Sequence, residues 1–392
     1  MKTGIKHIFF SLVATVVLLV LCYVVNNSPY PYGEETSLLT VLETYMNRHG
    51  KNTFERDSVL FLNVGFDKAL VNTVHGQEVI TDRAVLLDVL QTIQESGYKC
   101  VFLDIRLEGG LKTPSDSALV ERILKMGDSI VIARHWDYGR GKDFPLIDSR
   151  LTDQAAYCDY TASLFKSSYE RCQYLQHGAP SAPLKLYETI NGRSISGFGW
   201  IYKDGRTLCH NSLFVGIPED FSGSNTRTDG QPKYWNLTEY FYGEDAPFSK
   251  SDLVSLCKGK IIVIGDFDND RHDTYMGPQP GSYLHYLAYD NLRKGRHLLH
   301  WWYILMIATV FFVSFIQIAR QKRIIYLIPI VKKSKSRLLH FCLSLLGSAF
   351  LMGIVSYLSY ILFRNPIPVF IPTLAFTICD MWFRYKTFKY EA

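Results

Sequence analysis

Long uncharged runs of hydrophobic residues lie at both ends of this chain and enclose a large segment of mixed polarity. The first run covers residues 8–25, and three more cover 301–319, 338–363 and 367–383. A helix needs about 20 mostly apolar residues to cross the hydrocarbon core of a bilayer. The pattern therefore predicts four transmembrane α-helices, with residues 26–300 forming a domain on one side of the membrane.

Basic residues indicate which side that is. Lysines lie within residues 1–7, and Lys and Arg are dense in 320–337 and in the tail 384–392. Such residues favour the cytoplasmic side of short loops. We therefore expect an N-in/C-in protein of the bacterial inner membrane, embedded in the lipid bilayer, with residues 26–300 in the periplasm. The net charge of +5 comes mostly from these flanks and predicts no nucleic-acid partner.

The first hydrophobic run also resembles the core of a signal peptide. It is longer than such cores usually are, and no A-x-A cleavage box follows it. These features favour an uncleaved membrane anchor over a cleaved signal peptide.

The external segment alternates between strand-like and helix-like patterns. Its short apolar runs are typical of strands buried on both faces, and its longer runs place apolar residues at helical spacing. Alternation of this kind predicts an α/β domain with a mostly parallel sheet and flanking helices. The expected strands are 58–64, 100–103, 129–133 and 260–264, and the expected helices are 82–96, 116–126 and 283–294.

Residues 136–256 have weak periodicity and are rich in Tyr, Gly, Ser and Pro, which predicts an insertion in the α/β core. Within it, Asp204-Gly205 between alternating apolar residues indicates a β-hairpin. The preceding residues 26–57 are expected to be partly helical, over 38–46.

Five cysteines fall in the external segment, so an oxidising compartment would leave at least one of them unpaired. Cys100 opens an apolar run and is expected to be a core residue. Cys158 with Cys172, or Cys209 with Cys257, are the two pairings that we consider, and the sequence does not choose between them.

Acidic side chains follow three of the predicted strands. In open α/β sheets, ligands bind outside the carboxyl ends of the strands, so these acids and their polar neighbours are the candidate site. The ligand-binding candidates are Asp67, Arg83, Asp104, Asp266, Asp268, Asp270, His272 and Asp273.

The acidic loop 266–273 allows several interpretations. A calcium loop would need Gly and Glu where the chain has Arg271 and Gly277. An Asp-x-Asp phosphatase nucleophile should follow its strand directly, but Gly265 intervenes. A metal site using the oxygen atoms of Asp266, Asp268 and Asp270 and a solvated loop of turn-capping acids both remain open. We expect no cofactor and no enzymatic activity, because hydrolase and nucleotide-binding motifs are missing.

The same residues resemble a known family. Residues 59–67, 80–107 and 115–133 look like the start of a CHASE domain of the second class, and 258–297 resemble its closing block. These modules are extracellular sensors. They usually have one N-terminal span, then the sensor, then three spans and a cytoplasmic output domain. The resemblance thus implies an α/β sensory domain in the periplasm and a role in signal transduction.

Two features depart from that family. The usual Trp-Pro-Trp-Pro-Arg before the first helix is replaced by residues 78–83, which keep only the Arg. After the last predicted span, residues 384–392 are too few for an output domain. We therefore expect a non-enzymatic sensor that passes its signal to an unknown membrane or cytoplasmic output protein, and we expect a homodimer. The alternatives are a structural or assembly subunit of an envelope complex and an exported metal-dependent hydrolase centred on 266–273.

Overall fold

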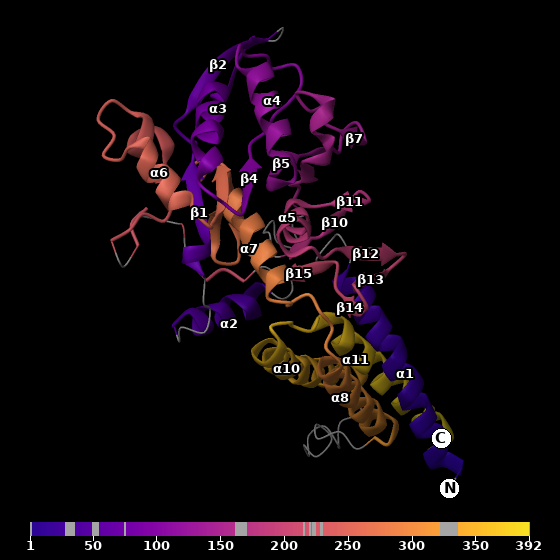
Figure 1. Ribbon diagram of the computed structural model, residues 1–392. Coiled ribbons are helices and arrows are strands. Elements are labelled where there is room, and N and C mark those ends of the chain that lie inside the picture. The colour runs from indigo at the N-terminus through magenta and orange to yellow at the C-terminus, as the bar shows by residue number, and fades with distance from the viewer. Residues whose placement is uncertain are drawn as a thin grey trace.

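An α/β domain and a group of long helices make up the protein (Figure 1). The computed structural model describes residues 2–27, 36–48, 55–73, 76–160, 171–214, 216–218, 221, 225–227, 230–321 and 336–391. Most of the predicted basic loop 320–337 therefore lies outside the described residues.

The centre of the α/β domain is a six-stranded sheet in which every neighbouring pair of strands is parallel. The four predicted strands form its middle, each within one residue of the expected start. The α/β class with a parallel sheet is thereby confirmed. In spatial order the strands are β16 (Trp235–Asn236), β1 (Val59–Asn63), β17 (Ile261–Gly265), β4 (Cys100–Asp104), β5 (Ile130–Arg134) and β8 (Ala155–Tyr157).

Helices cover both faces of this sheet. Successive side chains of a strand point to opposite faces, so Phe61 joins one hydrophobic core while Leu60 and Leu62 join the other. Both cores being filled explains why the strands are apolar throughout. The first core is closed by α2 (Thr36–Arg48), α5 (Ala182–Asn191) and α7 (Gly281–Arg293), and the second by α3 (Arg83–Thr92), α4 (Asp116–Met126) and α6 (Lys250–Cys257).

The predicted insertion, residues 136–256, is part of the same sheet. Its strand β8 extends one edge and its strand β16 extends the other. The predicted hairpin is present, with Gly205 at φ +59° in its turn.

The domain also contains short strands outside the six-stranded sheet. They are β2 (Lys68–Thr73), β3 (Gly76–Thr81), β6 (Trp136–Asp137), β7 (Lys142–Asp143), β9 (Arg171–Gln173), β10 (Leu175–Gln176), β11 (Ala179–Pro180), β12 (Ile195–Phe198), β13 (Ile201–Asp204), β14 (Thr207–Cys209), β15 (Ser212–Phe214), β18 (Arg271–Thr274) and β19 (Gly277–Pro280).

Neither of the two cysteine pairings is formed. Cys158, Cys172, Cys209 and Cys257 are all buried free thiols. Cys209 lies in the core on one face of the sheet and Cys257 in the core on the other, so the sheet separates them.

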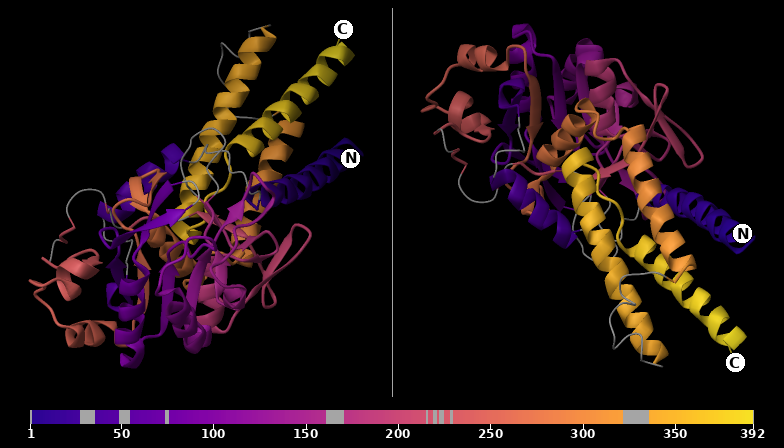
Figure 2. Two further views of the ribbon diagram at one scale, coloured as in Figure 1. Left: turned by 90° about the horizontal axis from the view of Figure 1, so that it is seen from above. Right: turned by 90° about the horizontal axis from the view of Figure 1, so that it is seen from below.

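Four long helices, α1 (Lys2–Asn26), α8 (Trp301–Ala319), α10 (Arg337–Phe363) and α11 (Phe370–Glu391), extend from one end of the α/β domain (Figures 1 and 2). Among the described residues, three helical segments are long and apolar enough to cross a membrane, which supports a membrane protein. They are Gly4–Asn26, Trp301–Ala319 and Leu338–Phe363. The predicted fourth span is not one of them, because α11 starts three residues later than expected and carries charged residues in its second half.

The first helix is attached to the α/β domain by polar contacts at its outer end. The hydroxyl of Tyr23 donates a hydrogen bond to the Cys209 carbonyl and accepts one from the Tyr202 amide, both at 3.0 Å. The Asn211 amide donates to the Asn27 side chain at 2.7 Å. Since these contacts use the hairpin β13–β14 and the residues after it, this hairpin joins α1 to the domain.

His210 lies at this junction and predicts acid sensitivity. Its imidazole stacks on Tyr23, is 3% exposed, and has no hydrogen-bond partner in the described structure. Burial, together with the nearby charges of Arg171 and His297, lowers its pKa from 6.5 to about 3. The native chain therefore takes up this proton less readily than the unfolded chain.

The buried, neutral His210 should make its full contribution to the free energy of unfolding above about pH 6.5. This contribution should be lost progressively as the pH drops toward 3. At pH 5 the expected loss is about 2 kcal/mol. Unfolding of the full chain in detergent at pH 7.5 and pH 5, compared with His210→Phe, measures it. The variant keeps a stacking ring but cannot titrate, so it should lose less stability on acidification. An equal loss in both proteins would contradict this role for His210.

Candidate functional site

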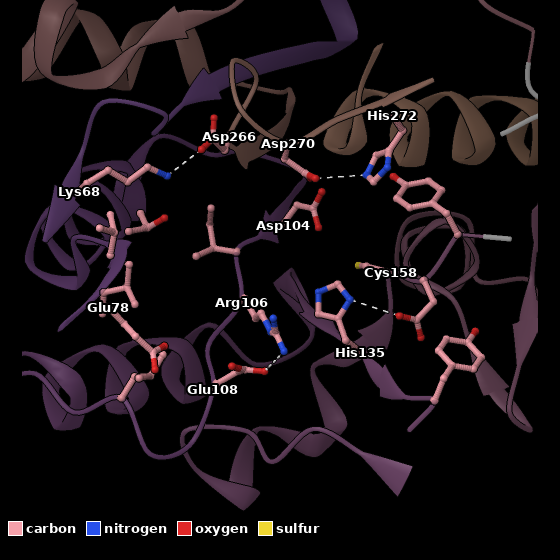
Figure 3. A pocket seen from close by; sticks show the side chains of 18 residues that line it. Lys68, Glu78, Asp104, Arg106, Glu108, His135, Cys158, Asp266, Asp270 and His272 are labelled. Carbon is pink, nitrogen blue, oxygen red and sulfur yellow. Dashed lines mark hydrogen bonds and ion pairs between the residues drawn. The ribbon is translucent and has the colours of Figure 1, made fainter. Parts of the chain in front are cut away.

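A cavity of about 570 Å³ opens at the carboxyl ends of the parallel strands (Figure 3). Asp104, the last residue of β4, lies on its wall, and Cys158 follows β8 directly. The acidic loop after β17 supplies Asp266 and Asp270 from another side. The cavity thus occupies the place where open α/β sheets bind ligands.

The cavity wall carries more acidic than basic groups. Its acids are Glu78, Asp104, Glu108, Asp159, Asp266 and Asp270, its strong bases are Lys68 and Arg106, and its imidazoles are His135 and His272. Two ion pairs lie among these residues, between Lys68 and Asp266 and between Arg106 and Glu108. Each imidazole also contacts a carboxylate, His135 that of Asp159 and His272 that of Asp270. Because the acids outnumber the strong bases, the cavity favours a positively charged ligand.

Asp104 is the acid most affected by its surroundings. Burial and, to a smaller extent, the nearby carboxylate of Asp270 raise its pKa to about 6. Its Oδ2 atom accepts a hydrogen bond from Ser282 Oγ at 2.8 Å, at the start of α7. A cation bound beside Asp104 would offset this unfavourable concentration of negative charge.

Three side chains from distant parts of the chain meet next to the cavity. One donor atom each from Asp104, Cys158 and His285 lies within 4.8 Å of the other two. Burial raises the pKa of the Cys158 thiol well above its usual value and lowers the pKa of His285 to about 3. A carboxylate, a thiol and a neutral imidazole are ligands typical of zinc sites.

Four of the eight predicted binding residues line this cavity, namely Asp104, Asp266, Asp270 and His272. Asp266 accepts a hydrogen bond from Lys68 Nζ at 2.7 Å, and the Lys68 interactions lower its pKa against the effect of burial. The Asp270 Oδ1 and His272 Nε2 atoms are 3.2 Å apart. The rule that ligands bind at strand ends therefore selected four residues that line this cavity.

The other four predicted residues are not on the cavity wall. Asp67 is buried and accepts a hydrogen bond from Thr238, and burial raises its pKa. Asp268 accepts from Asn63 at 2.5 Å and from Tyr234 at 2.6 Å. These two carboxylates are therefore held by protein groups.

Arg83 and Asp273 occupy different positions again. Arg83 is 1% exposed and forms an ion pair with Asp116 at 2.7 Å. Asp273 is an exposed residue of β18. Arg83 thus contributes to the domain's interior, and Asp273 faces solvent.

Several cavity residues were not among the predicted set. Lys68, His135 and the adjacent pair Cys158 and Asp159 line the cavity from three separate parts of the chain. His285 lies beside Asp104 and Cys158 next to the cavity. No local spacing in the sequence connects these parts. The position of Cys158 directly after a strand was the usable signal, but β8 has only three residues and its pattern was too short to identify.

Comparison of the chain with protein-family models, with curated proteins and with solved structures finds no match. The resemblance to CHASE domains of the second class stays a prediction.

Proposed function

We propose that this protein is a membrane-anchored extracytoplasmic binding module, of the kind found in CHASE sensors, that takes a small cationic ligand in its acidic cavity. It would pass the signal through its membrane helices to a membrane or cytoplasmic output protein. The observation that carries this proposal is the position of α7. This helix starts at the cavity and is followed, after residues 294–300, by the membrane helix α8.

Helix α7 is fixed at its cavity end. Ser282, in its first turn, is fully buried and bonds to Asp104. The carbonyl of Gly281 accepts a hydrogen bond from the hydroxyl of Tyr160, which also lines the cavity. A ligand that moves Asp104 or Tyr160 therefore acts on the start of α7.

The other end of α7 is close to the membrane helices. After α7 ends at Arg293, His297 contacts the buried Asp204 at 2.8 Å, and Leu299 donates to the Leu208 carbonyl at 2.9 Å. Helix α8 then begins at Trp301. The partners Asp204 and Leu208 belong to the hairpin that also holds α1, so a shift of α7 would reach two membrane helices. A ligand drives such a shift only if it binds the two arrangements with different affinity.

The proposed topology has four crossings, N-in and C-in, in the bacterial inner membrane, with α11 as the fourth span. Two observations support it. The start of α1 and the end of α11 both lie at the ends of their helices that are farther from the α/β domain (Figures 1 and 2). Phe376 of α11 is fully buried, with ring centroids 5.8 Å from Phe311 and 5.0 Å from Phe315 of α8. We also propose that the protein forms a homodimer.

The alternative hydrolase centred on 266–273 receives less support from the geometry. Asp266 is paired with Lys68, Asp268 is held by Asn63 and Tyr234, and Asp273 is exposed. These carboxylates do not converge on one point, as a catalytic metal site would require.

Hydrogen exchange of the full chain in lipid nanodiscs tests the coupling. Ser282→Ala removes the bond between α7 and Asp104, and we expect several-fold faster exchange of the amides of residues 298–301. The matched control is Ser129→Ala, which removes a side-chain hydrogen bond to the Met126 carbonyl and should leave 298–301 unchanged. If Ser282→Ala changes only the first turn of α7, the proposed route to the membrane is wrong.

A further inference from the structure

We infer that Asp104, Cys158 and His285 form a binding site for a late first-row divalent ion, with Zn²⁺ as its expected occupant. This inference rests on the proposed function, because it makes the ion itself the cationic ligand of the cavity. It uses residues outside the acidic loop 266–273.

The three donor atoms decide which ions fit. The site offers one oxygen, one sulfur and one nitrogen atom. Mg²⁺ and Ca²⁺ prefer all-oxygen sites, whereas Zn²⁺ binds thiolate, imidazole and carboxylate together. Zinc bonds of about 2.0–2.3 Å place tetrahedral ligands about 3.5 Å apart. Since the donors here lie within 4.8 Å of one another, small side-chain movements would complete the set.

His285 is the observation that points to a ligand. It is 1% exposed, and neither of its ring nitrogens has a partner of normal hydrogen-bond geometry in the described structure. Buried polar atoms are rarely left without one. The ring is held in place by stacking on Tyr160 at 4.4 Å and by an edge contact with Phe102 at 5.7 Å. A metal ion beside Cys158 and Asp104 would give this imidazole its missing partner.

The surroundings of Asp104 suit a three-ligand site with one open position. Ser282 bonds to Oδ2 of Asp104, which orients the carboxylate as outer residues do in metal sites. Asp104 and Cys158 both line the cavity, so the fourth position would face the cavity and take water or a small anion. The ion would bind as the thiol of Cys158 loses its proton to solvent, which leaves a neutral group of Zn²⁺, thiolate and carboxylate.

The test uses the metal-free full chain in detergent, with Co²⁺ as a spectroscopic substitute for Zn²⁺. We expect one Co²⁺ per chain, a thiolate-to-cobalt charge-transfer absorption, and displacement by Zn²⁺. Cys158→Ser and His285→Phe should each weaken binding at least 100-fold. Ser282→Ala should weaken it about 10–100-fold.

Two matched controls exist in the chain. Cys172 is another buried thiol of the external domain, and His210 is another buried imidazole without hydrogen-bond partners in the described residues. Cys172→Ser and His210→Phe should bind Co²⁺ like the wild type. Absence of the charge-transfer absorption in the wild type, or binding of Co²⁺ by Cys158→Ser and His285→Phe as tight as that of the wild type, would overturn the site.

A measurement on the wild type avoids variants that fold poorly. Zn²⁺ should slow alkylation of Cys158 by iodoacetamide at least tenfold, as read by peptide mass spectrometry, and should leave Cys172 unaffected. Equal alkylation rates of Cys158 with and without Zn²⁺ would overturn the inference.

The experiments distinguish an error in the proposed zinc site from an error in the proposed signalling route. If Zn²⁺ binds but hydrogen exchange at residues 298–301 does not change, the metal site stands and the signalling route is wrong. If Ser282→Ala changes exchange at 298–301 while no Zn²⁺ binds, the zinc site alone is wrong.

Discussion

Replacing Arg83 with methionine is expected to lower the free energy of unfolding of the α/β domain by about 3 kcal/mol. The guanidinium is almost fully buried, pairs with Asp116, and donates to the carbonyls of Leu111 and Glu108. Methionine fills a similar volume but removes the donor to both carbonyls and the cation beside Asp116, which keeps its hydrogen bonds from Thr113. Asp116 is partly exposed, so water recovers some of its solvation and the loss stays below that of a fully buried pair.

The effect should extend to the cavity. Leu111 and Glu108 belong to the segment between β4 and α4, which forms one side of the cavity wall. Denaturant unfolding of the full chain in detergent, followed by tryptophan fluorescence, measures the loss. Arg150→Met is the matched control, because Arg150 is ion-paired too, with Glu121 and Asp148, but is 55% exposed. If both variants lose the same stability, the burial of Arg83 is not the cause.

Arg83 also shows where prediction from sequence succeeds and where it fails. Its place at the start of α3 was predicted correctly, because the helical spacing of the apolar residues that follow is a local signal. Its role was predicted as ligand binding, but the structure places the side chain away from the cavity and against Asp116. Whether a charged side chain faces a cavity or an interior partner depends on a residue far away in the sequence.

The sheet was predictable to the extent that its strands are long. Strands β1, β4, β5 and β17 have five residues each and are buried on both faces, which gives continuous apolar runs. The edge strands β8 and β16 have three and two residues, too few for any period to show. Consequently the region that contains both was predicted as an insertion.

The residues of the candidate site also divide into those with a local sequence signal and those without one. Asp104 was predicted because it ends a strand, and strand ends meet at one edge of a parallel sheet. His285 was not among the predicted site residues, since one imidazole on an amphipathic helix gives no local signal. The packing of α7 against one face of the sheet brings this residue to Asp104 and Cys158.

Gly265→Ala is expected to cost about 3 kcal/mol and to disturb the cavity end of α7. Gly265 ends β17, between Asn63 of β1 and Asp104 of β4. A Cβ atom there would lie 1.9 Å from Ser282 Oγ and 2.9 Å from Ser282 Cβ. Rotating the hydroxyl would relieve only the first contact, so the start of α7 must move away from the sheet. Gly353→Ala lies inside helix α10, where a new Cβ meets nothing within 4 Å; it is the control and should not destabilise the chain.

A double variant separates this clash from other effects of the new methyl group. Ser282→Gly removes both atoms that the alanine would meet, at a cost of about 1 kcal/mol for a glycine in a helix. If the contact causes the loss, Gly265→Ala should cost much less in the Ser282→Gly background than in the wild type, a non-additivity typical of residues in contact. Equal costs in both backgrounds, measured by denaturant unfolding, would show that the close approach of α7 to the sheet is not what requires glycine at 265. Because the double variant also lacks the bond to Asp104, its residues 298–301 should exchange as fast as those of Ser282→Ala even where stability is restored.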